Sequence, residues 1–296
     1  MVEEARVSEG TGAVLGLWDL KLSAKPTTGY LMTSPEGKCT ANCGFCPQAR
    51  SSEGGTKRLS RVAWPKVEFD DVLEVMEENE GVLKRVCIQA LRYPGIEDDL
   101  FEIVEGIGNV SDVPISVSCQ PLNEEDVRRL SDRGVDRIGI PLDAATPEAF
   151  DSVKGESAGG PYQWESHLKF IKKATEILEN KVSTHQIVGL GESEKEMVDR
   201  IQFFRDMGVN VALFAFTPIE GTPMADRERP SIWRYRRIQI ARHLIANDLT
   251  RFSDMEFEGG EITGFGTTED VLKREVRSGK PFLTSGCPGC NRPFYN

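Results

Sequence analysis

The sequence has few positive charges relative to its negative ones, and it has no long apolar run. Its 296 residues hold 36 Lys and Arg against 47 Asp and Glu, a formal net charge of -11. This balance argues against general nucleic-acid binding. No stretch approaches the roughly 20 apolar residues of a membrane-spanning helix. The first ten residues are rich in glutamate, the opposite of a basic signal-peptide start. We therefore expect a cytoplasmic protein that binds neither nucleic acid nor membrane.

Internal repeats and low-complexity tracts are also missing. The composition, 39% hydrophobic and 28% charged, is that of an ordinary globular protein with material for a large core. The chain has only three histidines, which are scattered and which we interpret as core or surface residues. It has seven cysteines. In a cytoplasmic protein such cysteines are more typical of metal ligands or reactive thiols than of disulfides.

Short β-rich runs alternate with amphipathic helical patterns along most of the chain. The predicted strands cover residues 30–34, 85–90, 114–119, 137–142, 181–188 and 210–216, and the predicted helices cover 69–80, 96–107, 124–133, 164–179, 194–207 and 232–246. Gly81, Gly134 and Gly208 follow three of these helices, where a left-handed residue is favoured. Parallel strands need crossover connections, so about six βα units predict an α/β protein with a parallel (β/α) barrel of the TIM type, partial or complete.

We divide the chain into three parts. Residues 1–28 form an N-terminal extension, 29–252 form the barrel, and 253–296 form a C-terminal segment. Barrels of this kind commonly hold about 250 residues in one unit. The two flanking segments are expected to lie across the ends of the barrel.

The stretch "KCTANCGFCPQARS" places Cys39, Cys43 and Cys46 directly after the first predicted strand, with the spacing C-x3-C-x2-C. Chemistry in a parallel barrel gathers in the loops that follow the strands. Three thiolates can hold three irons of a cubane cluster and leave the fourth iron open to a ligand. The alternative is a structural zinc site, but such sites are usually closed by four ligands, and this stretch has no histidine or fourth cysteine nearby.

This spacing, with Phe45 before the third cysteine, resembles the radical S-adenosylmethionine (SAM) superfamily. The resemblance covers about residues 30–252 and is closest to biotin synthases. "GFCPQARS" matches their cluster loop, "IVGLGES" (187–193) their SAM-contacting strand and turn, and "GTPMAD" (221–226) a later loop. It implies that Cys39, Cys43 and Cys46 hold a 4Fe-4S cluster, at which bound SAM is cleaved to a 5'-deoxyadenosyl radical that removes hydrogen from an unactivated carbon.

The same resemblance implies which residues contact SAM. Phe45 and Ile187 would lie near the adenine, with Gly189 and Glu192 in the adjoining turn. Asp143, in "IPLDAATPE", would reach the ribose.

Each of these assignments has a plainer alternative. A Gly-x-Gly such as Gly189–Gly191 by itself means only a tight turn. Glu192 is equally consistent with a solvated loop acid, and Asp143 with a helix cap before Pro147. The chain also departs from the biotin synthase pattern at Pro141, where that family usually carries asparagine.

Four further cysteines are available for a second cluster. Cys87 and Cys119 lie on separate predicted strands and match two ligands of the sulfur-donating cluster in biotin synthases. A strand cysteine taken alone is usually a small buried hydrophobe. The third cysteine of that family aligns with Ser183 and its arginine ligand aligns near Glu256, so the family's own ligand set is incomplete here.

The C-terminal stretch "SGCPGCNRPFYN" (285–296) offers Cys287 and Cys290 as replacements. Their C-x2-C spacing also fits half of a zinc or rubredoxin-like site, or a redox dithiol. If this tail folds over the barrel mouth, Cys87, Cys119, Cys287 and Cys290 can meet at one auxiliary iron-sulfur cluster. Together with the first three cysteines, this set accounts for all seven.

A biotin-synthase-like core with this tail resembles one subunit of the split, two-chain lipoyl synthases. The resemblance implies insertion of sulfur from the auxiliary cluster at C6 or C8 of an octanoyl chain on a lysine of a lipoyl carrier protein. It also implies a homologous second radical SAM chain and an electron donor such as ferredoxin. The basic run 234–243 would face the acidic carrier protein or form a solvated helix face.

Three other functions remain open at this point. The first is biotin synthase, with dethiobiotin as substrate. The second is a methylornithine synthase type of enzyme, which would have no sulfur-donating cluster. The third is a noncatalytic metal-binding or scaffold protein on the same fold.

Overall fold

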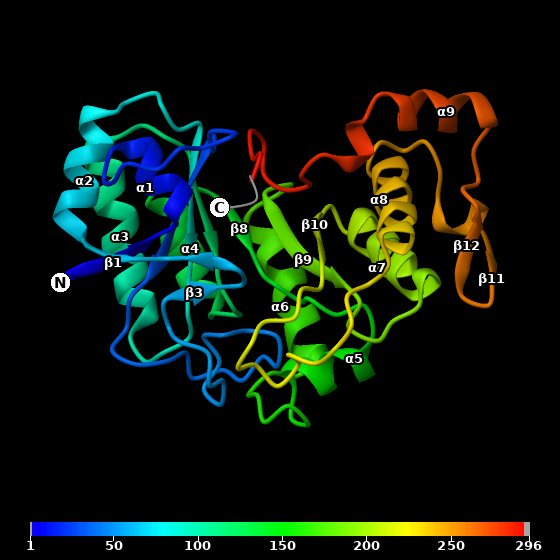
Figure 1. The fold of residues 1–296 in the computed structure, drawn as a ribbon, viewed down its shortest axis with the longest axis horizontal. Helices are drawn as coiled ribbons and strands as arrows, with labels where there is room; N and C mark the ends of the chain where they lie inside the picture. The colour runs from blue at the N-terminus through cyan, green and yellow to red at the C-terminus, as the bar shows by residue number, and fades with distance from the viewer. Residues whose placement is uncertain (1, 293–296) are drawn as a thin grey trace.

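The computed structural model describes residues 2–292 and is built around an eight-stranded sheet with the order β10-β9-β8-β7-β6-β2-β1-β5. Six of its strands pair in parallel. These are β2 (Thr28–Thr33), β6 (Arg85–Gln89), β7 (Ile115–Ser118), β8 (Val135–Gly139), β9 (Val182–Val188) and β10 (Asn210–Ala215). Because β10 and β5 lie at the two edges, the sheet stays open on one side. The predicted parallel barrel is confirmed in its partial form (Figure 1).

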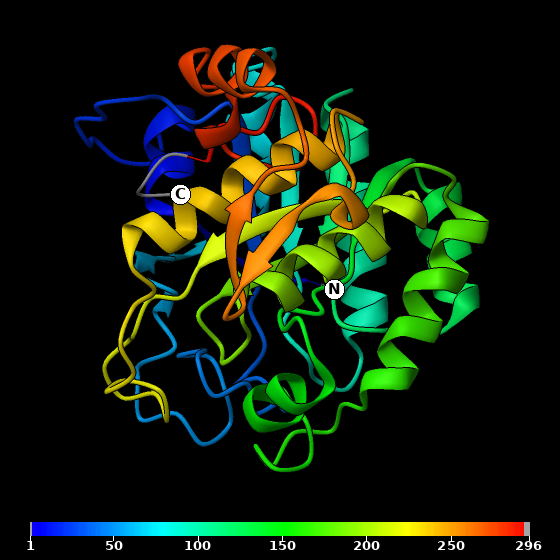
Figure 2. The same ribbon diagram turned by 90° about the vertical axis from the view of Figure 1, so that its right-hand side faces the viewer.

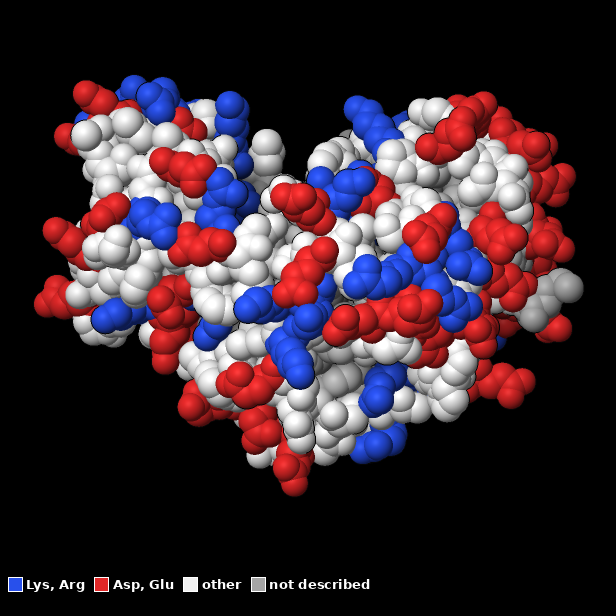
Figure 3. Space-filling view, turned by 180° about the vertical axis from the view of Figure 1, so that it is seen from behind, with Lys and Arg blue, Asp and Glu red and all other residues white. Residues whose placement is uncertain are grey.

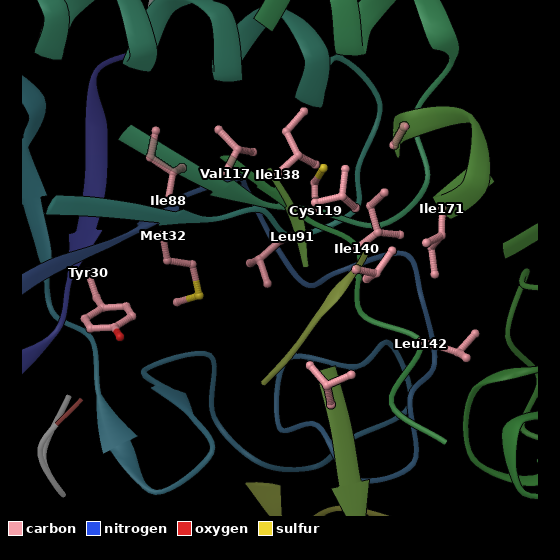
Figure 4. Packing of buried hydrophobic residues seen from close by; sticks show 14 of the residues in the cluster. Tyr30, Met32, Ile88, Leu91, Val117, Cys119, Ile138, Ile140, Leu142 and Ile171 are labelled. Atoms are coloured by element: carbon pink, nitrogen blue, oxygen red, sulfur yellow. The ribbon is translucent and has the colours of Figure 1, made fainter. Parts of the chain in front are cut away.

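Helices cover the outer face of the parallel strands, as the crossover connections require. They are α2 (Phe69–Glu78), α3 (Ile96–Val110), α4 (Glu124–Asp132), α6 (Trp164–Ile177), α7 (Glu194–Asp206) and α8 (Ile232–Ala246). Helix α5 (Pro147–Lys154) lies instead at the end of the barrel where the strands finish (Figure 1). Side chains alternate between the two faces of each strand. Figure 4 shows Ile88, Val117 and Ile138 directed toward the helices, whereas Tyr30 and Met32 point into the barrel.

The N-terminal extension joins the sheet, so the expectation that it lies across a barrel end is wrong for its first strand. β1 (Glu4–Val7) pairs antiparallel with both β2 and β5 (Lys66–Glu68). Helix α1 (Glu9–Leu15) follows, and Trp18 packs against it with its Nε1 donating to the Glu9 carbonyl at 2.8 Å. A hairpin of β3 (Arg58–Leu59) and β4 (Val62–Ala63) lies between β2 and β5 in the chain.

The C-terminal segment runs along the outside before it returns to the barrel. It contains η1 (Phe252–Asp254), the hairpin of β11 (Glu256–Glu258) and β12 (Glu261–Gly264), α9 (Glu269–Arg277) and η2 (Lys280–Phe282). Figure 2 shows the hairpin on the outer side of the molecule. The chain then reaches the opposite end of the barrel from the loops after the strands, where residues 284–292 lie (Figure 1).

The six predicted strands and six predicted helices are all present, with shifts of a few residues at their ends. Gly81, Gly134 and Gly208 have φ of 79°, 87° and 74°, which confirms the left-handed turns. Helices α5 and α9 were not predicted. Helix α5 has eight residues, and α9 has no buried residue, so neither shows the long apolar stripe on which the prediction relied.

Two general expectations concern charge and membranes. Acidic and basic side chains are interspersed over the face seen in Figure 3, with no large basic field. Within residues 2–292, no helix combines the length and the apolarity needed to cross a membrane.

Candidate active site

Cys39, Cys43 and Cys46 lie on the loop that follows β2, at the end of the barrel where the parallel strands finish. Short hydrogen bonds shape this loop. The Cys46 amide donates to the Cys43 carbonyl at 2.9 Å, and the Cys39 amide donates to the Gln48 carbonyl at 3.1 Å. Cys39 and Cys43 are buried and Cys46 is half-buried. The loop thus holds the three predicted thiols together beneath the surface.

Two neighbouring segments, the end of α5 and the loop after β10, fix the cluster loop in place. The Gly44 amide donates to the Val153 carbonyl at the end of α5 at 2.7 Å, and the Met224 amide donates to the Gly44 carbonyl at 3.2 Å. The Glu53 amide donates to the Gly221 carbonyl at 2.7 Å. The loop after β10, which contains the "GTPMAD" stretch, therefore packs directly on the cluster loop.

The surroundings of Cys43 and Cys46 favour the protonated thiol in the metal-free chain. Burial raises the pKa of Cys43 to about 12, and the nearby Lys154 ammonium acts in the opposite direction. Burial and the neighbouring Cys43 raise the pKa of Cys46. Metal binding deprotonates such thiols outright, so loading of this site releases protons.

Three thiols are a donor set that suits an iron-sulfur cluster. Among residues 2–292, no three His, Cys, Asp or Glu side chains converge closely enough to hold one metal ion. Three free thiols on one loop, each within electrostatic range of the others, nevertheless match a cubane in which each thiolate would bind one iron. Phe45 lies half-buried between Gly44 and Cys46 on the same loop.

Asp143 lies directly beyond β8 and is held by a buried cation. Its backbone is left-handed, with φ 71°, and its Oδ2 lies 2.7 Å from the Nζ of Lys154, which has no exposed surface. The alternative reading of Asp143 as a helix cap is wrong, because Thr146 caps α5 by accepting from the Ala149 amide. The amide of Ile187 on β9 donates to the Asp143 carbonyl at 2.8 Å, which joins two of the predicted SAM contacts.

The turn after β9 is rigid and enclosed. Gly189 and Gly191 have φ of 106° and 126°, a conformation that favours glycine. Glu192 is 3% exposed and accepts from the amides of Gly189 and Leu190 at 2.8 and 2.9 Å. Its Oε1 also lies 2.8 Å from Nη2 of Arg234. The reading of Glu192 as a solvated loop acid is therefore wrong.

The helix α8 arginines that were candidates for a carrier-protein face are partly used within the chain. Arg234 pairs with Glu192, and Arg237 pairs with Glu194 through a hydrogen bond of 2.9 Å from Nε. These contacts fasten α8 to the start of α7. They leave fewer free charges on this helix than the sequence suggests.

The C-terminal tail enters the opposite end of the barrel, where the parallel strands begin. Ser285 Oγ accepts from the Leu213 amide at 2.8 Å, Asn210 Nδ2 donates to the Gly286 carbonyl at 2.8 Å, and Thr27 Oγ1 donates to the Gly289 carbonyl at 2.6 Å. We expected the tail to fold over the barrel mouth, where the strands finish. This expectation is wrong, because the tail lies at the end where the strands begin.

The tail brings Cys287 and Cys290 to Cys87. The pKa of Cys87 is raised to about 12, mainly by burial and then by the charges of the nearby Cys287 and Cys290 thiolates. Tyr30 Oη lies 2.9 Å from Cys290 Sγ, and Ser116 Oγ donates to Cys287 Sγ at 3.5 Å. Tyr30 pairs with Cys87 in the β2–β6 register, so both side chains enter the barrel from adjacent strands. Pro293–Asn296 of the quoted tail lie outside the described residues.

Cys119, the fourth predicted member, lies elsewhere. It follows β7, is 2% exposed and is directed toward the helices (Figure 4). Burial and the charges of Glu97 and Asp126 raise its pKa to about 12, with no contribution from another cysteine. It lines a cavity of about 340 Å³ between the loops after β6 and β7. The structure thus assembles three of the four predicted auxiliary thiols and not the fourth.

Several residues near the three thiols were not identified from the sequence. Tyr30 and Ser116 were assigned only to strands. Arg292, two residues after Cys290, lies with its guanidinium carbon 3.9 Å from the centre of the Phe214 ring. Glu256, where the sequence alignment put an arginine ligand, is exposed on the outer hairpin. The arginine inside the barrel is therefore Arg292, and Glu256 does not take an equivalent place.

Comparisons with known proteins concern the barrel and the loop after β2. The model of the Radical SAM superfamily matches residues 34–204. The biotin synthase of Sulfurihydrogenibium sp. is 28% identical over 202 residues, which cover 67% of this chain and 57% of that protein. The biotin synthase of Acinetobacter calcoaceticus is 25% identical over 229 residues, which cover 75% of this chain and 66% of that protein. The chain thus spans between half and two thirds of the length of these relatives.

Two solved structures share the fold. Methylornithine synthase (PylB) superposes with a TM-score of 0.59 and 13% identity over 81% of this chain and 77% of that one. HydG, the FeFe-hydrogenase maturase from Carboxydothermus hydrogenoformans, superposes with a TM-score of 0.58 and 17% identity over 75% of this chain and 51% of that one. The family match covers more than half of the chain, and the shared fold agrees with it. This protein therefore belongs to the radical SAM superfamily.

Proposed function

We propose that this protein is a radical SAM sulfurtransferase that inserts sulfur into an octanoyl chain on a lysine of a lipoyl carrier protein. In this proposal it is one half of a split lipoyl synthase, with a homologous second chain and a ferredoxin-type electron donor. The observation that carries it is that the tail places Cys290 Sγ 2.9 Å from Tyr30 Oη and Cys287 Sγ 3.5 Å from Ser116 Oγ, the two register neighbours of Cys87. This end of the barrel is opposite the SAM-cluster loop (Figure 1).

The donor set at this end of the barrel suits an iron-sulfur cluster. Thiolates are the preferred ligands of such clusters, and the three thiols come from a strand and from a C-x2-C turn. The Tyr30 hydroxyl and the Arg292 guanidinium are close by. When bound, the SAM cluster would supply the electron that cleaves SAM to the hydrogen-abstracting radical, and the auxiliary cluster would supply the sulfur. Cys119 is not needed in this version of the proposal.

The chain itself contributes position and exclusion of water. His185 lies on β9, where it pairs with Ala212 of β10 in the strand register. Burial lowers its pKa to about 4, so it is neutral near pH 7. Its ring lies 5.0 Å from that of Phe214. A carbon chain placed beside these rings would be held between the radical source and the sulfur source, which is what productive transfer requires.

Biotin synthase is the second candidate, and the relatives named biotin synthase favour it. Against it, Ser183 stands where that family has a cysteine, and Glu256 is outside the barrel. Only the substrate distinguishes the two functions, since both use the same radical and the same type of sulfur donor.

The test is mass spectrometry of the anaerobically reconstituted protein given SAM, a strong reductant, an octanoyl-lysyl peptide and dethiobiotin together. The proposal predicts one added sulfur on the peptide and none on dethiobiotin. Sulfur on dethiobiotin would instead assign biotin synthesis. Deoxyadenosine without either product would contradict both.

A variant separates the two cysteine sets. Cys287→Ala with Cys290→Ala is expected to keep most SAM cleavage and to lose sulfur transfer, because the altered thiols are at the far end of the barrel. Equal loss of both activities would contradict the auxiliary-cluster assignment.

A further inference from the structure

Lys154 is an unusually enclosed cation for a soluble protein. It is the last residue of α5, and none of its surface is exposed. A buried ammonium is costly unless its donors are engaged and its charge is compensated. Neither the sequence motifs nor the superfamily match assigns it a role.

All three donors of Lys154 are used. Nζ donates to Asp143 Oδ2 at 2.7 Å, to the Pro141 carbonyl at 2.7 Å and to Gln120 Oε1 at 3.2 Å. The rings of Phe150 and Tyr162 lie 5.7 and 5.2 Å from the ammonium. No donor remains for a ligand, so Lys154 can act on a bound molecule only through its partners.

The most consequential partner is Asp143. One carboxylate oxygen, Oδ2, is fixed by Lys154, and no described residue donates a hydrogen bond to the other, Oδ1. The backbone of Asp143 is left-handed, a conformation that an aspartate adopts only when its surroundings hold it. Lys154 and the strand contacts of Asp143 to β9 provide that restraint.

Lys154 is also tied to the cluster loop. The residue before it, Val153, accepts the Gly44 amide at 2.7 Å. One helix end therefore contacts both the loop that carries the SAM-cluster thiols and the acid that faces the SAM site.

We propose that Lys154 is a positioning residue for SAM: it orients Asp143 so that Oδ1 is free to accept a hydrogen bond from the SAM ribose. Without this ion pair, Asp143 would lose its fixed orientation and its compensating charge. This inference rests on membership of the radical SAM superfamily and not on the sulfur chemistry proposed above.

The test compares SAM affinity in two lysine variants of the full chain, reconstituted anaerobically. Lys154→Met removes the donors and the charge but keeps a similar length. Lys173→Met, an exposed lysine on α6 that pairs with Glu176, is the matched control. SAM binding is followed by its effect on the spectrum of the reduced cluster, and iron content and thermal unfolding are measured on the same samples. We expect at least a tenfold loss of SAM affinity for Lys154→Met and no change for Lys173→Met.

A double-mutant comparison covers the case in which Lys154→Met alone fails to fold. Asp143→Asn with Lys154→Met leaves no unpaired buried charge. If Lys154 acts through Asp143, the double variant binds SAM as weakly as Asp143→Asn and no more weakly. The inference is overturned if a folded, cluster-loaded Lys154→Met binds SAM within twofold of the wild-type chain. It is also overturned if the loss of SAM affinity in the double variant equals the product of the losses in the two single variants.

Discussion

At the scale of single residues, the seven cysteines differ in the surroundings that the fold gives them. Three share the loop after β2, and three more meet at the other end of the barrel, from β6 and from the tail. Cys119 is packed between strand and helices with acidic neighbours. The C-x3-C-x2-C spacing predicted the first group because its ligands are local. The second group depends on where the tail folds, which no local pattern encodes.

A pair of single substitutions tests this division. Cys87→Ser is expected to lower the iron and sulfide content of the reconstituted chain by the amount of one cluster, since it removes a thiol from the group of three. Cys119→Ser is expected to leave that content unchanged, because its thiol is outside the group. Iron and sulfide assays on both variants provide the measurement. A loss of the same size in Cys119→Ser would restore the four-cysteine set.

At the scale of elements, the sequence predicted the regular βα units well and their ends less well. Helix α5 was missed because its eight residues are too few to show a clear stripe. Yet α5 carries Lys154 and the carbonyl that holds Gly44. Gln120 Oε1, in the loop after β7, lies 3.2 Å from both Lys154 Nζ on α5 and His167 Nε2 on α6. The members of this polar network are far apart in sequence and give no motif.

One consequence of this network is a pH dependence of stability. Burial, together with the Lys154 charge, lowers the pKa of His167 from 6.5 to about 2, so the ring is neutral in the folded chain. Between these two pH values the unfolded chain binds a proton that the folded chain does not. Stability is therefore full above pH 6.5 and falls as the pH is lowered. The loss from this residue is about 2 kcal/mol at pH 5.

The measurement is urea unfolding of the wild-type chain and of His167→Gln at pH 7 and pH 5. The variant keeps a polar side chain and lacks the titrating ring, so its stability should fall by about 2 kcal/mol less over this interval. Identical pH dependence of the two proteins would show that His167 is not held neutral.

A second prediction concerns the contact between the loop after β10 and the cluster loop. Gly221 has φ 78°, and a Cβ there would lie 2.5 Å from the Gly54 nitrogen, a backbone atom that cannot yield easily. Gly221→Ala is expected to lower the free energy of unfolding by about 1 to 3 kcal/mol and to weaken retention of the SAM cluster.

Gly81→Ala is the matched control. Gly81 has nearly the same backbone angle, φ 79°, but no heavy atom lies within 4 Å of the added carbon. It reports the conformational cost alone, which is about 1 kcal/mol. Equal destabilisation by the two substitutions, with the cluster retained in both, would contradict a close contact at Gly221.

At the scale of the whole molecule, the barrel separates two thiol groups. The SAM-cluster loop occupies the end where strands finish, and the tail occupies the end where they begin (Figure 1). The sequence predicted the barrel and the grouping of Cys39, Cys43 and Cys46 on one loop, because hydrophobic periodicity and a local motif specify them. It misplaced the tail, because residues 284–292 are positioned by contacts to Thr27, Arg85 and Asn210, which are more than 70 residues away in the chain.

The central claim is that this chain donates its own sulfur to a substrate inside the barrel. The most direct measurement is a single turnover with protein reconstituted from isotopically heavy sulfide, with SAM, reductant and the octanoyl-lysyl peptide, read by mass spectrometry. The account predicts a product that carries one heavy sulfur atom, and no such product from Cys287→Ala with Cys290→Ala. A thiolated product with light sulfur, or deoxyadenosine with no thiolated product, would contradict it.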